Sequence, residues 1–108
     1  MVKNIGIDII ENKRIKLKEK FVLRVLSSSE FKLFNDFKTV KRKREFVAGR
    51  WACKEAIIKI IDQPIPFNCM DIFYVHHKPT IKISDLDIKI SISHERRHSV
   101  AVAILQET

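Results

Sequence analysis

The alternation of hydrophobic and polar positions divides the chain into an N-terminal strand, a helical middle and a strand-rich C-terminal part. Residues 2–10 are almost continuously apolar, which predicts a strand buried on both faces. Asp8 interrupts this run, and an acid there needs a partner or a metal ion because an unpaired buried charge is costly. Residues 12–26 have a helical pattern, in one piece or two. The spacing of Ser27 and Glu30 predicts a capping box that opens another short helix.

The longest helical pattern covers residues 41–61 and is apolar on more than one side. We therefore expect this helix to lie at the centre of the fold or against another subunit. Pro64 cannot continue the helix. The remaining sequence is rich in Ile and Val and predicts strands at residues 71–75, 80–83, 87–93 and 99–105, with turns at 76–79 and 95–98. Helices followed by antiparallel strands predict an α+β fold in a single domain, residues 1–108. In this fold the N-terminal strand and the helices accompany a long central helix packed on an antiparallel sheet.

Composition and charge narrow the classes of partner. The chain has 108 residues and a formal net charge of +8, and a basic surface favours nucleic acid, acidic proteins or phosphorylated small molecules. No apolar run approaches the roughly 18 residues of a membrane span, and the N-terminus has no signal-peptide pattern. We therefore expect a cytoplasmic location and no membrane partner. Cys53 and Cys69 do not form a CxxC pair, so we expect free thiols.

Four ionisable residues form a candidate site when the predicted elements are combined. Glu55 and Lys59 project from one face of the long helix, Asp8 lies on the first strand, and His94 follows a later strand. Magnesium binds few protein carboxylates and takes substrate phosphate oxygens as further ligands, so this set suits a magnesium ion that holds a phosphate ester. Simpler explanations exist for each residue: a surface ion pair for Glu55 and Lys59, a satisfied core acid for Asp8, and a structural role for His94.

Four segments carry a family resemblance that runs in order over nearly the whole chain. They are Gly6-Ile7-Asp8-Ile9, Lys13-Arg14-Ile15, the stretch from Phe46 to Lys59 around Lys54-Glu55-Ala56, and Ser91-Ile92-Ser93-His94. Together they resemble the bacterial holo-acyl-carrier-protein synthases, which are the short type of 4'-phosphopantetheinyl transferase. The resemblance implies the 4'-phosphopantetheinyl transferase fold. It also implies transfer of the 4'-phosphopantetheine arm of coenzyme A to a serine of apo acyl carrier protein, a step of fatty acid biosynthesis that releases adenosine 3',5'-bisphosphate.

The resemblance also implies roles for individual residues. Asp8 and Glu55 are expected to bind Mg²⁺ against the coenzyme A pyrophosphate, and with Lys59, which contacts the same phosphates, they are the expected catalytic residues. Coenzyme A is expected to contact Arg42, Arg50, Lys59, Pro79 and His94. Acyl carrier protein is expected to bind Arg14, Lys20, Phe21 and Arg24. The family further implies a homotrimer with an active site at each subunit interface.

Two other functions are compatible with the sequence. A small basic nucleic-acid-binding protein would use Lys41-Arg42-Lys43-Arg44 and Arg96-Arg97 on phosphates, although the chain has few aromatic residues for base stacking. An inactive relative would still bind carrier protein. Two positions also depart from the family pattern. Asp62-Gln63-Pro64 stands where a glycine-rich turn is common, and Glu95 stands where a hydroxyl residue often follows the motif histidine.

Overall fold

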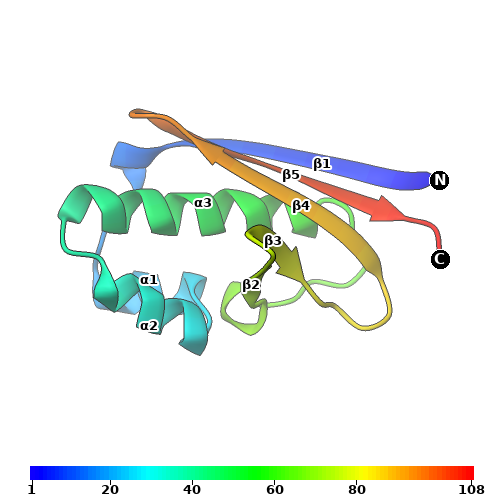
Figure 1. Cartoon of the computed structure of the whole chain (residues 1–108), viewed down its shortest axis with the longest axis horizontal. Coiled ribbons are helices and arrows are strands. Elements are labelled where there is room, and N and C mark those ends of the chain that lie inside the picture. Colours follow the sequence, from blue (N-terminus) through cyan, green and yellow to red (C-terminus); the bar gives the residue numbers. More distant parts are fainter.

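The long helix α3 lies between a three-stranded antiparallel sheet on one side and two short helices on the other (Figure 1). The computed structural model describes all residues, 1–108. The helices are α1 (Glu19–Val25), α2 (Ser28–Asp36) and α3 (Val40–Ile58), with 3₁₀ turns η1 (Asn12–Arg14) and η2 (Phe67–Cys69). The strands are β1 (Val2–Glu11), β2 (Ile72–Val75), β3 (Lys78–Ile81), β4 (Asp87–His94) and β5 (His98–Gln106). The predicted α+β class and the four C-terminal strands are confirmed.

The main sheet has the strand order β1-β5-β4, so the first strand pairs with the last. In its central row Asp8 of β1 lies opposite Ala101 of β5, which lies opposite Ile92 of β4. Strands β2 and β3 form a separate two-stranded sheet, joined by a turn at His76 and His77, whose φ angles are 50° and 65°. The turn is therefore shorter than the predicted 76–79, because Lys78 and Pro79 already belong to β3.

The prediction that the first strand is buried on both faces is wrong. Every second residue of β1 points away from α3, and Ile5, Ile7 and Ile9 are 62%, 59% and 63% exposed. On the other face Gly6 is buried against α3, where an added Cβ would overlap the carbonyl oxygen of Ala56 and lie 3.1 Å from Cγ2 of Ile60. The sheet therefore has one face covered by α3 and one open apolar face.

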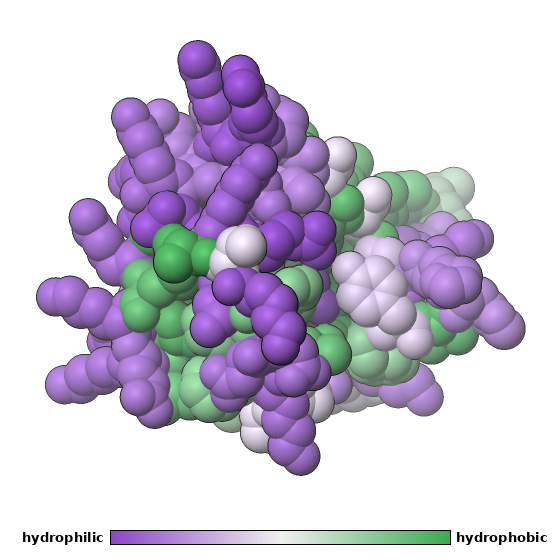
Figure 2. Space-filling model, turned by 60° about the vertical axis from the view of Figure 1, so that its left-hand side comes forward, coloured by the Kyte–Doolittle hydropathy of each residue, from purple (hydrophilic) through white to green (hydrophobic).

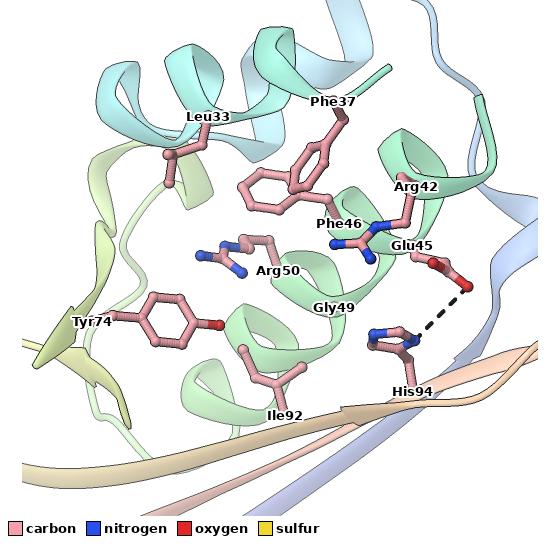
Figure 3. Close-up of a pocket in the computed structure, with 10 residues that line it drawn as sticks. All are labelled: Leu33, Phe37, Arg42, Glu45, Phe46, Gly49, Arg50, Tyr74, Ile92 and His94. Atoms are coloured by element: carbon pink, nitrogen blue, oxygen red, sulfur yellow. Dashed lines mark ion pairs between the residues drawn. The ribbon is translucent and has the colours of Figure 1, made fainter. Parts of the chain in front are cut away.

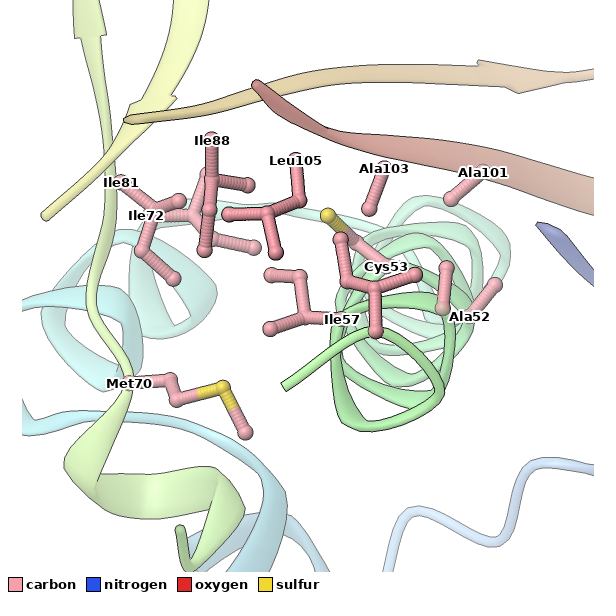
Figure 4. Close-up of a cluster of buried hydrophobic side chains, with 12 residues drawn as sticks. Ala52, Cys53, Ile57, Met70, Ile72, Ile81, Ile88, Ala101, Ala103 and Leu105 are labelled. Carbon is pink, nitrogen blue, oxygen red and sulfur yellow. The ribbon is translucent and has the colours of Figure 1, made fainter. Parts of the chain in front are cut away.

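The core on the sheet side of α3 is built from small and branched side chains (Figure 4). Ala52, Cys53 and Ala56 allow the helix to approach β5, whose Ala101 and Ala103 face it. Burial of α3 by the sheet and by a second cluster on its other side confirms that this helix is central. Both cysteines are free, and burial raises the pKa of the Cys53 thiol to about 12, so this thiol is un-ionised.

The second cluster joins α1 and α2 to the first half of α3 through Val22, Leu26, Phe34, Val47 and Ala48. The predicted capping box opens α2, because the Ser27 hydroxyl accepts from the backbone N–H of Glu30 at 3.2 Å and the Glu30 carboxylate accepts from that of Ser27 at 2.9 Å.

The helical pattern expected over residues 12–26, in one piece or two, forms two pieces, and the α-helix is confined to the second. Only Glu19–Val25 is α-helical, after η1 and an extended segment. In that segment buried Ile15 and half-buried Leu17 alternate with exposed Lys16 and Lys18, which is the two-residue period of extended chain rather than that of a helix.

None of the helices combines the length and the apolar character needed to cross a bilayer.

Candidate active site

Asp8 and Lys59 come together at the contact between β1 and α3. The Lys59 ammonium lies 3.6 Å from Oδ1 of Asp8 and donates a hydrogen bond to the carbonyl oxygen of Ile7 at 2.6 Å. The side chains of Asp8 and Lys59 are 21% and 51% exposed, so both can reach a ligand from solvent. The pairing of Asp8 with Lys59 joins two of the three predicted catalytic residues.

Glu55 lies one turn before Lys59 on the same side of α3. Strand β1 runs antiparallel to the helix, and Gly6 lies against Ala56. Asp8 is about 6.6 Å further along the strand, which corresponds to about one helical turn towards the N-terminus of α3. Asp8 therefore lies beside the turn formed by residues 52–55. The half-buried Glu55 carboxylate forms no hydrogen bond or ion pair with the protein, so its oxygens are available to a ligand.

A pocket of about 350 Å³ opens on another side of α3 (Figure 3). It collects three of the residues predicted to contact coenzyme A, namely Arg42, Arg50 and His94. Pro79, which was also predicted to contact coenzyme A, does not line the pocket. It pairs across the β2–β3 hairpin with Tyr74, and Tyr74 does line the pocket. The lining comes from α2, α3, β2 and β4 and consists of Leu33, Phe37, Arg42, Glu45, Phe46, Gly49, Arg50, Tyr74, Ile92 and His94.

Arg50 is the most unusual side chain of this pocket. It is only 6% exposed, and its guanidinium carbon lies 4.2 Å from the ring centre of Phe46 and 5.6 Å from that of Tyr74. The aromatic rings contact the guanidinium group but offer no hydrogen-bond acceptors to its N–H groups in the guanidinium plane. Nε and Nη2 are buried and have no hydrogen-bond partner in the protein. Buried donors of this kind normally have a partner, so they indicate a ligand with acceptor atoms, such as a phosphate.

The sequence did not indicate Glu45 or Tyr74 as site residues. Glu45 is buried on α3 and its Oε2 lies 3.8 Å from Nδ1 of His94, so it orients the predicted histidine (Figure 3). Tyr74 reaches the pocket from the β2–β3 hairpin. Both roles depend on contacts between residues distant in sequence, for which the local pattern carries no signal. Glu95 stands where the family often has a hydroxyl residue after the motif histidine. Its carboxylate accepts a hydrogen bond from the backbone N–H of Arg97 within the β4–β5 turn.

The cluster of Asp8, Glu55 and Lys59 lies on a different side of α3 from the pocket that contains Arg50. Arg50 and Lys59 are nine residues apart, which places them about 180° apart around a helix that turns about 100° per residue. Glu55 is about 140° from Arg50 by the same count. No hydrogen bond or ion pair links the two groups. A single chain therefore carries two separate groups of predicted site residues, with Asp8, Glu55 and Lys59 in one and Arg42, Arg50 and His94 in the other.

The residues predicted to bind carrier protein lie on η1 and α1. Arg14, Lys20 and Arg24 are exposed, whereas Phe21 is half-buried and its ring centre lies 5.9 Å from that of Trp51. Hydrophilic side chains project from this end of the molecule around smaller hydrophobic patches (Figure 2). Leu23 of α1, Leu33 of α2 and Val40 of α3 are exposed large hydrophobic residues.

Comparison with known proteins agrees with this architecture. Residues 4–104 match the family described as the 4'-phosphopantetheinyl transferase superfamily. The chain is 59% identical over 107 residues to a holo-[acyl-carrier-protein] synthase of Mycoplasma capricolum, covering 98% of this chain and 96% of the relative. A crystal structure of such a synthase from Bacillus anthracis, in complex with CoA (3',5'-ADP), superposes with a TM-score of 0.90 at 35% identity. That alignment covers 100% of this chain and 99% of the other. A Helicobacter pylori synthase in complex with coenzyme A gives a TM-score of 0.78 at 30% identity, covering 95% of this chain and 100% of the other.

The chain belongs to the 4'-phosphopantetheinyl transferase superfamily. Within that class it is an enzyme of the holo-[acyl-carrier-protein] synthase type, as the sequence resemblance predicted. Its class of reaction is phosphopantetheine transfer, and the two other functions considered from the sequence are not favoured. Within the basic run from Lys41 to Arg44, Arg42 lines the pocket and Arg44 donates to the carbonyl oxygen of Ile15 at 3.2 Å.

Proposed function

We propose that this enzyme transfers 4'-phosphopantetheine from coenzyme A to a serine of apo acyl carrier protein in fatty acid biosynthesis, with Mg²⁺, and releases adenosine 3',5'-bisphosphate. The observation that best supports coenzyme A as the donor is the buried Arg50 guanidinium, whose Nε and Nη2 have no hydrogen-bond partner and which shares its pocket with Arg42 and His94. Three basic side chains around one pocket suit the phosphates of a nucleotide. Synthases similar to this chain have been crystallised with coenzyme A.

The carboxylates of Asp8 and Glu55 fit a magnesium ion. Asp8 pairs only with Lys59, and Glu55 has no protein partner, so both carboxylates keep oxygen atoms free for a cation. Two carboxylates completed by substrate phosphate and water are a usual donor set for Mg²⁺. When bound there, Mg²⁺ would neutralise charge on the coenzyme A pyrophosphate.

The chain's own residues supply positioning and charge for the transfer. The hydroxyl oxygen of the carrier serine attacks the phosphorus atom next to pantetheine, and the bond from that phosphorus to the oxygen of the nucleotide phosphate breaks. The leaving phosphate gains negative charge. Lys59 is held by the carbonyl oxygen of Ile7 before substrate binds, so its positive charge is already in place to stabilise that phosphate. Asp8 or Glu55 accepts the serine proton.

The assembly proposed for this enzyme is a homotrimer that buries the open face of the sheet. Ile5, Ile7 and Ile9 are more than half exposed, and Val102 and Ile104 lie beside them on β5. An apolar face of this kind favours association. A neighbouring subunit would also complete the active site by bringing its Arg50 pocket to the Asp8 and Glu55 group, because one chain leaves these groups on different sides of α3.

The proposed surface for acyl carrier protein is formed by Arg14, Lys20, Phe21 and Arg24. The three basic residues are exposed, and the chain has a net charge of +8. Carrier proteins are acidic, so charge complementarity would accelerate their association with this surface. Phe21 contributes through its exposed edge, since Trp51 covers part of the ring.

The experiment that tests the proposed reaction is the mass gain of apo acyl carrier protein with coenzyme A, measured by mass spectrometry with and without Mg²⁺. Transfer is expected only with the metal, and Asp8→Asn and Glu55→Gln are expected to abolish it. Asp62→Asn is the matched control, because Asp62 is an exposed acid beyond the end of α3. Failure of wild type with several apo carrier proteins, or full activity without divalent cations, contradicts the proposal.

Subunit mixing tests the shared active site. Asp8→Asn and Arg50→Met are each expected to be inactive alone, but trimers assembled from both variants would contain some sites with neither substitution. Activity should therefore return after the two variants are unfolded and refolded together. Absence of recovery in mixed trimers contradicts an active site formed between subunits.

A further inference from the structure

One carboxylate in the interior faces two cations of α3. Glu30 and Lys54 are fully buried, and Arg50, one turn before Lys54, is 6% exposed. The Glu30 carboxylate lies 2.6 Å from the Lys54 ammonium but 3.7 Å from Nε of Arg50. The cluster of Glu30, Arg50 and Lys54 therefore holds two positive charges and one negative charge. Lys54 belongs to the motif around Lys54-Glu55-Ala56 that carries the family resemblance.

The hydrogen bonds of this group are divided unequally between the two cations. Lys54 donates to Glu30, to the carbonyl oxygen of Val25 at 2.7 Å and to that of Phe67 at 2.9 Å. An ammonium group has three N–H donors, so Lys54 is fully satisfied. Glu30 also accepts from the backbone N–H groups of Ser27 at 2.9 Å and Ile72 at 2.8 Å. Arg50 donates no hydrogen bond to this group, and its Nε and Nη2 have no hydrogen-bond partner in the protein.

We infer that Lys54 is a positioning residue that neutralises Glu30 and so keeps the charge of Arg50 available to a phosphate of the substrate nucleotide. Glu30 is needed structurally, because it caps α2 and accepts from the first residue of β2. Without Lys54, its negative charge would be balanced by Arg50, the other cation in reach. This inference rests on the proposed function, because it assumes that the Arg50 pocket holds the nucleotide.

Two variants separate this role from simple packing. Lys54→Met removes the neutralising cation and leaves Glu30 to pair with Arg50. The double variant Glu30→Gln with Lys54→Met removes both charges of the pair and leaves the full charge of Arg50 to the pocket. The amide oxygen of glutamine can still accept one of the backbone N–H groups that Glu30 now accepts. If the pair only supports packing, the double variant should be no better than the single one.

The experiment is isothermal titration calorimetry with adenosine 3',5'-bisphosphate, on variants whose fold is checked by circular dichroism. Lys54→Met is expected to weaken binding by at least about tenfold, the size of one charged hydrogen bond. The double variant is expected to bind within about threefold of wild type. In the transfer assay, Lys54→Met should raise KM for coenzyme A much more than it lowers kcat.

Wild-type affinity in Lys54→Met overturns the inference, and so does a folded double variant that binds at least about tenfold more weakly than wild type. If Lys54→Met does not fold, the double variant decides alone: retained affinity supports the inference, and lost affinity overturns it. A wild-type protein that does not bind the bisphosphate also overturns it. The transfer assay on apo carrier protein judges the proposed function separately, because it does not depend on which residue holds the nucleotide.

Discussion

Lys59 lies 3.6 Å from the Asp8 carboxylate while donating to the carbonyl oxygen of Ile7, so two groups of β1 hold the lysine that caps the C-terminus of α3. Asp8 and Lys59, which are far apart in the sequence, thus form one charged pair at the surface. Because both side chains are partly exposed, their ion pair contributes little to stability, about 1 kcal/mol or less. The geometry is therefore better explained by a role in binding phosphate than by a role in holding the fold.

The first prediction concerns Lys59. Lys59→Met should lower kcat/KM for transfer by about 100-fold, because it removes a preplaced charge next to the reacting phosphate. The midpoint of thermal unfolding should change little. Lys89→Met is the control, since Lys89 forms a similar exposed ion pair with Asp87 at 3.4 Å on β4. Equal kinetics for Lys59→Met and wild type would show that Lys59 has no catalytic role.

The second prediction concerns the open face of the sheet. Ile7→Asp should convert the assembly into folded monomers, because it places a charge in the middle of the apolar face that the proposed trimer buries. Light scattering measures the mass, and circular dichroism measures the fold. Leu86→Asp is the control, because Leu86 is 39% exposed but lies in the loop between β3 and β4. A trimer that survives Ile7→Asp would place the interface elsewhere.

The third prediction concerns the contact between β1 and α3. Gly6→Ala should lower the free energy of unfolding by about 1–3 kcal/mol, because the added methyl group meets the backbone carbonyl of Ala56. Gly49→Ala should cost less, since its Cβ would lie 3.1 Å from the Ile92 side chain, which can move. Urea denaturation compares the two variants. An equal or smaller loss for Gly6→Ala would contradict the close packing of strand on helix.

The fourth prediction concerns acid stability. Burial alone would raise the pKa of Asp71, but hydrogen bonds from the Ser27 and Ser29 hydroxyls outweigh it and hold that pKa below its ordinary value. Ionised Asp71 therefore stabilises the fold above its unfolded-state pKa, and this stabilisation is lost as the pH falls through the folded-state pKa. The free energy of unfolding should decrease below about pH 4.

Ser29→Ala should make that decrease smaller, because it removes one of the donors to Asp71. The measurement is a series of urea denaturation curves between about pH 5 and pH 3. Ser28→Ala is the control, since Ser28 is exposed at the start of α2 and forms no side-chain hydrogen bond. An unchanged pH dependence in Ser29→Ala would show that its hydroxyl does not affect ionisation of Asp71.

The sequence was sufficient for the parts of the fold that depend on local pattern. The Ser27 and Glu30 spacing located the start of α2, and the apolar girth of residues 41–61 identified a central helix. The Ile- and Val-rich composition of residues 99–105 predicted the strand β5. The open face of β1 was missed because a nearly continuous apolar run has the same appearance whether helices or other subunits cover it.

The candidate site was predicted best where its residues belong to one motif. Glu55 and Lys59 share a helix face by spacing alone, and Asp8, indicated as an acid within an apolar run, pairs with Lys59. Glu45 and Tyr74 depend on contacts across the fold and had no local signal. Glu30 was visible only as a capping residue, although its carboxylate also meets Lys54 in the interior.

The pairing of the first strand with the last also bears on how the protein matures. Within the sheet, β1 has β5 as its single neighbour, so Asp8 has no strand partner until Ala101 has been synthesised and has left the ribosome. A nascent chain that lacks its final residues therefore has the residues of the Arg50 pocket encoded in full but no fixed position for Asp8. Loss of even a short C-terminal segment would inactivate the enzyme from a distance, without touching any residue of the active site.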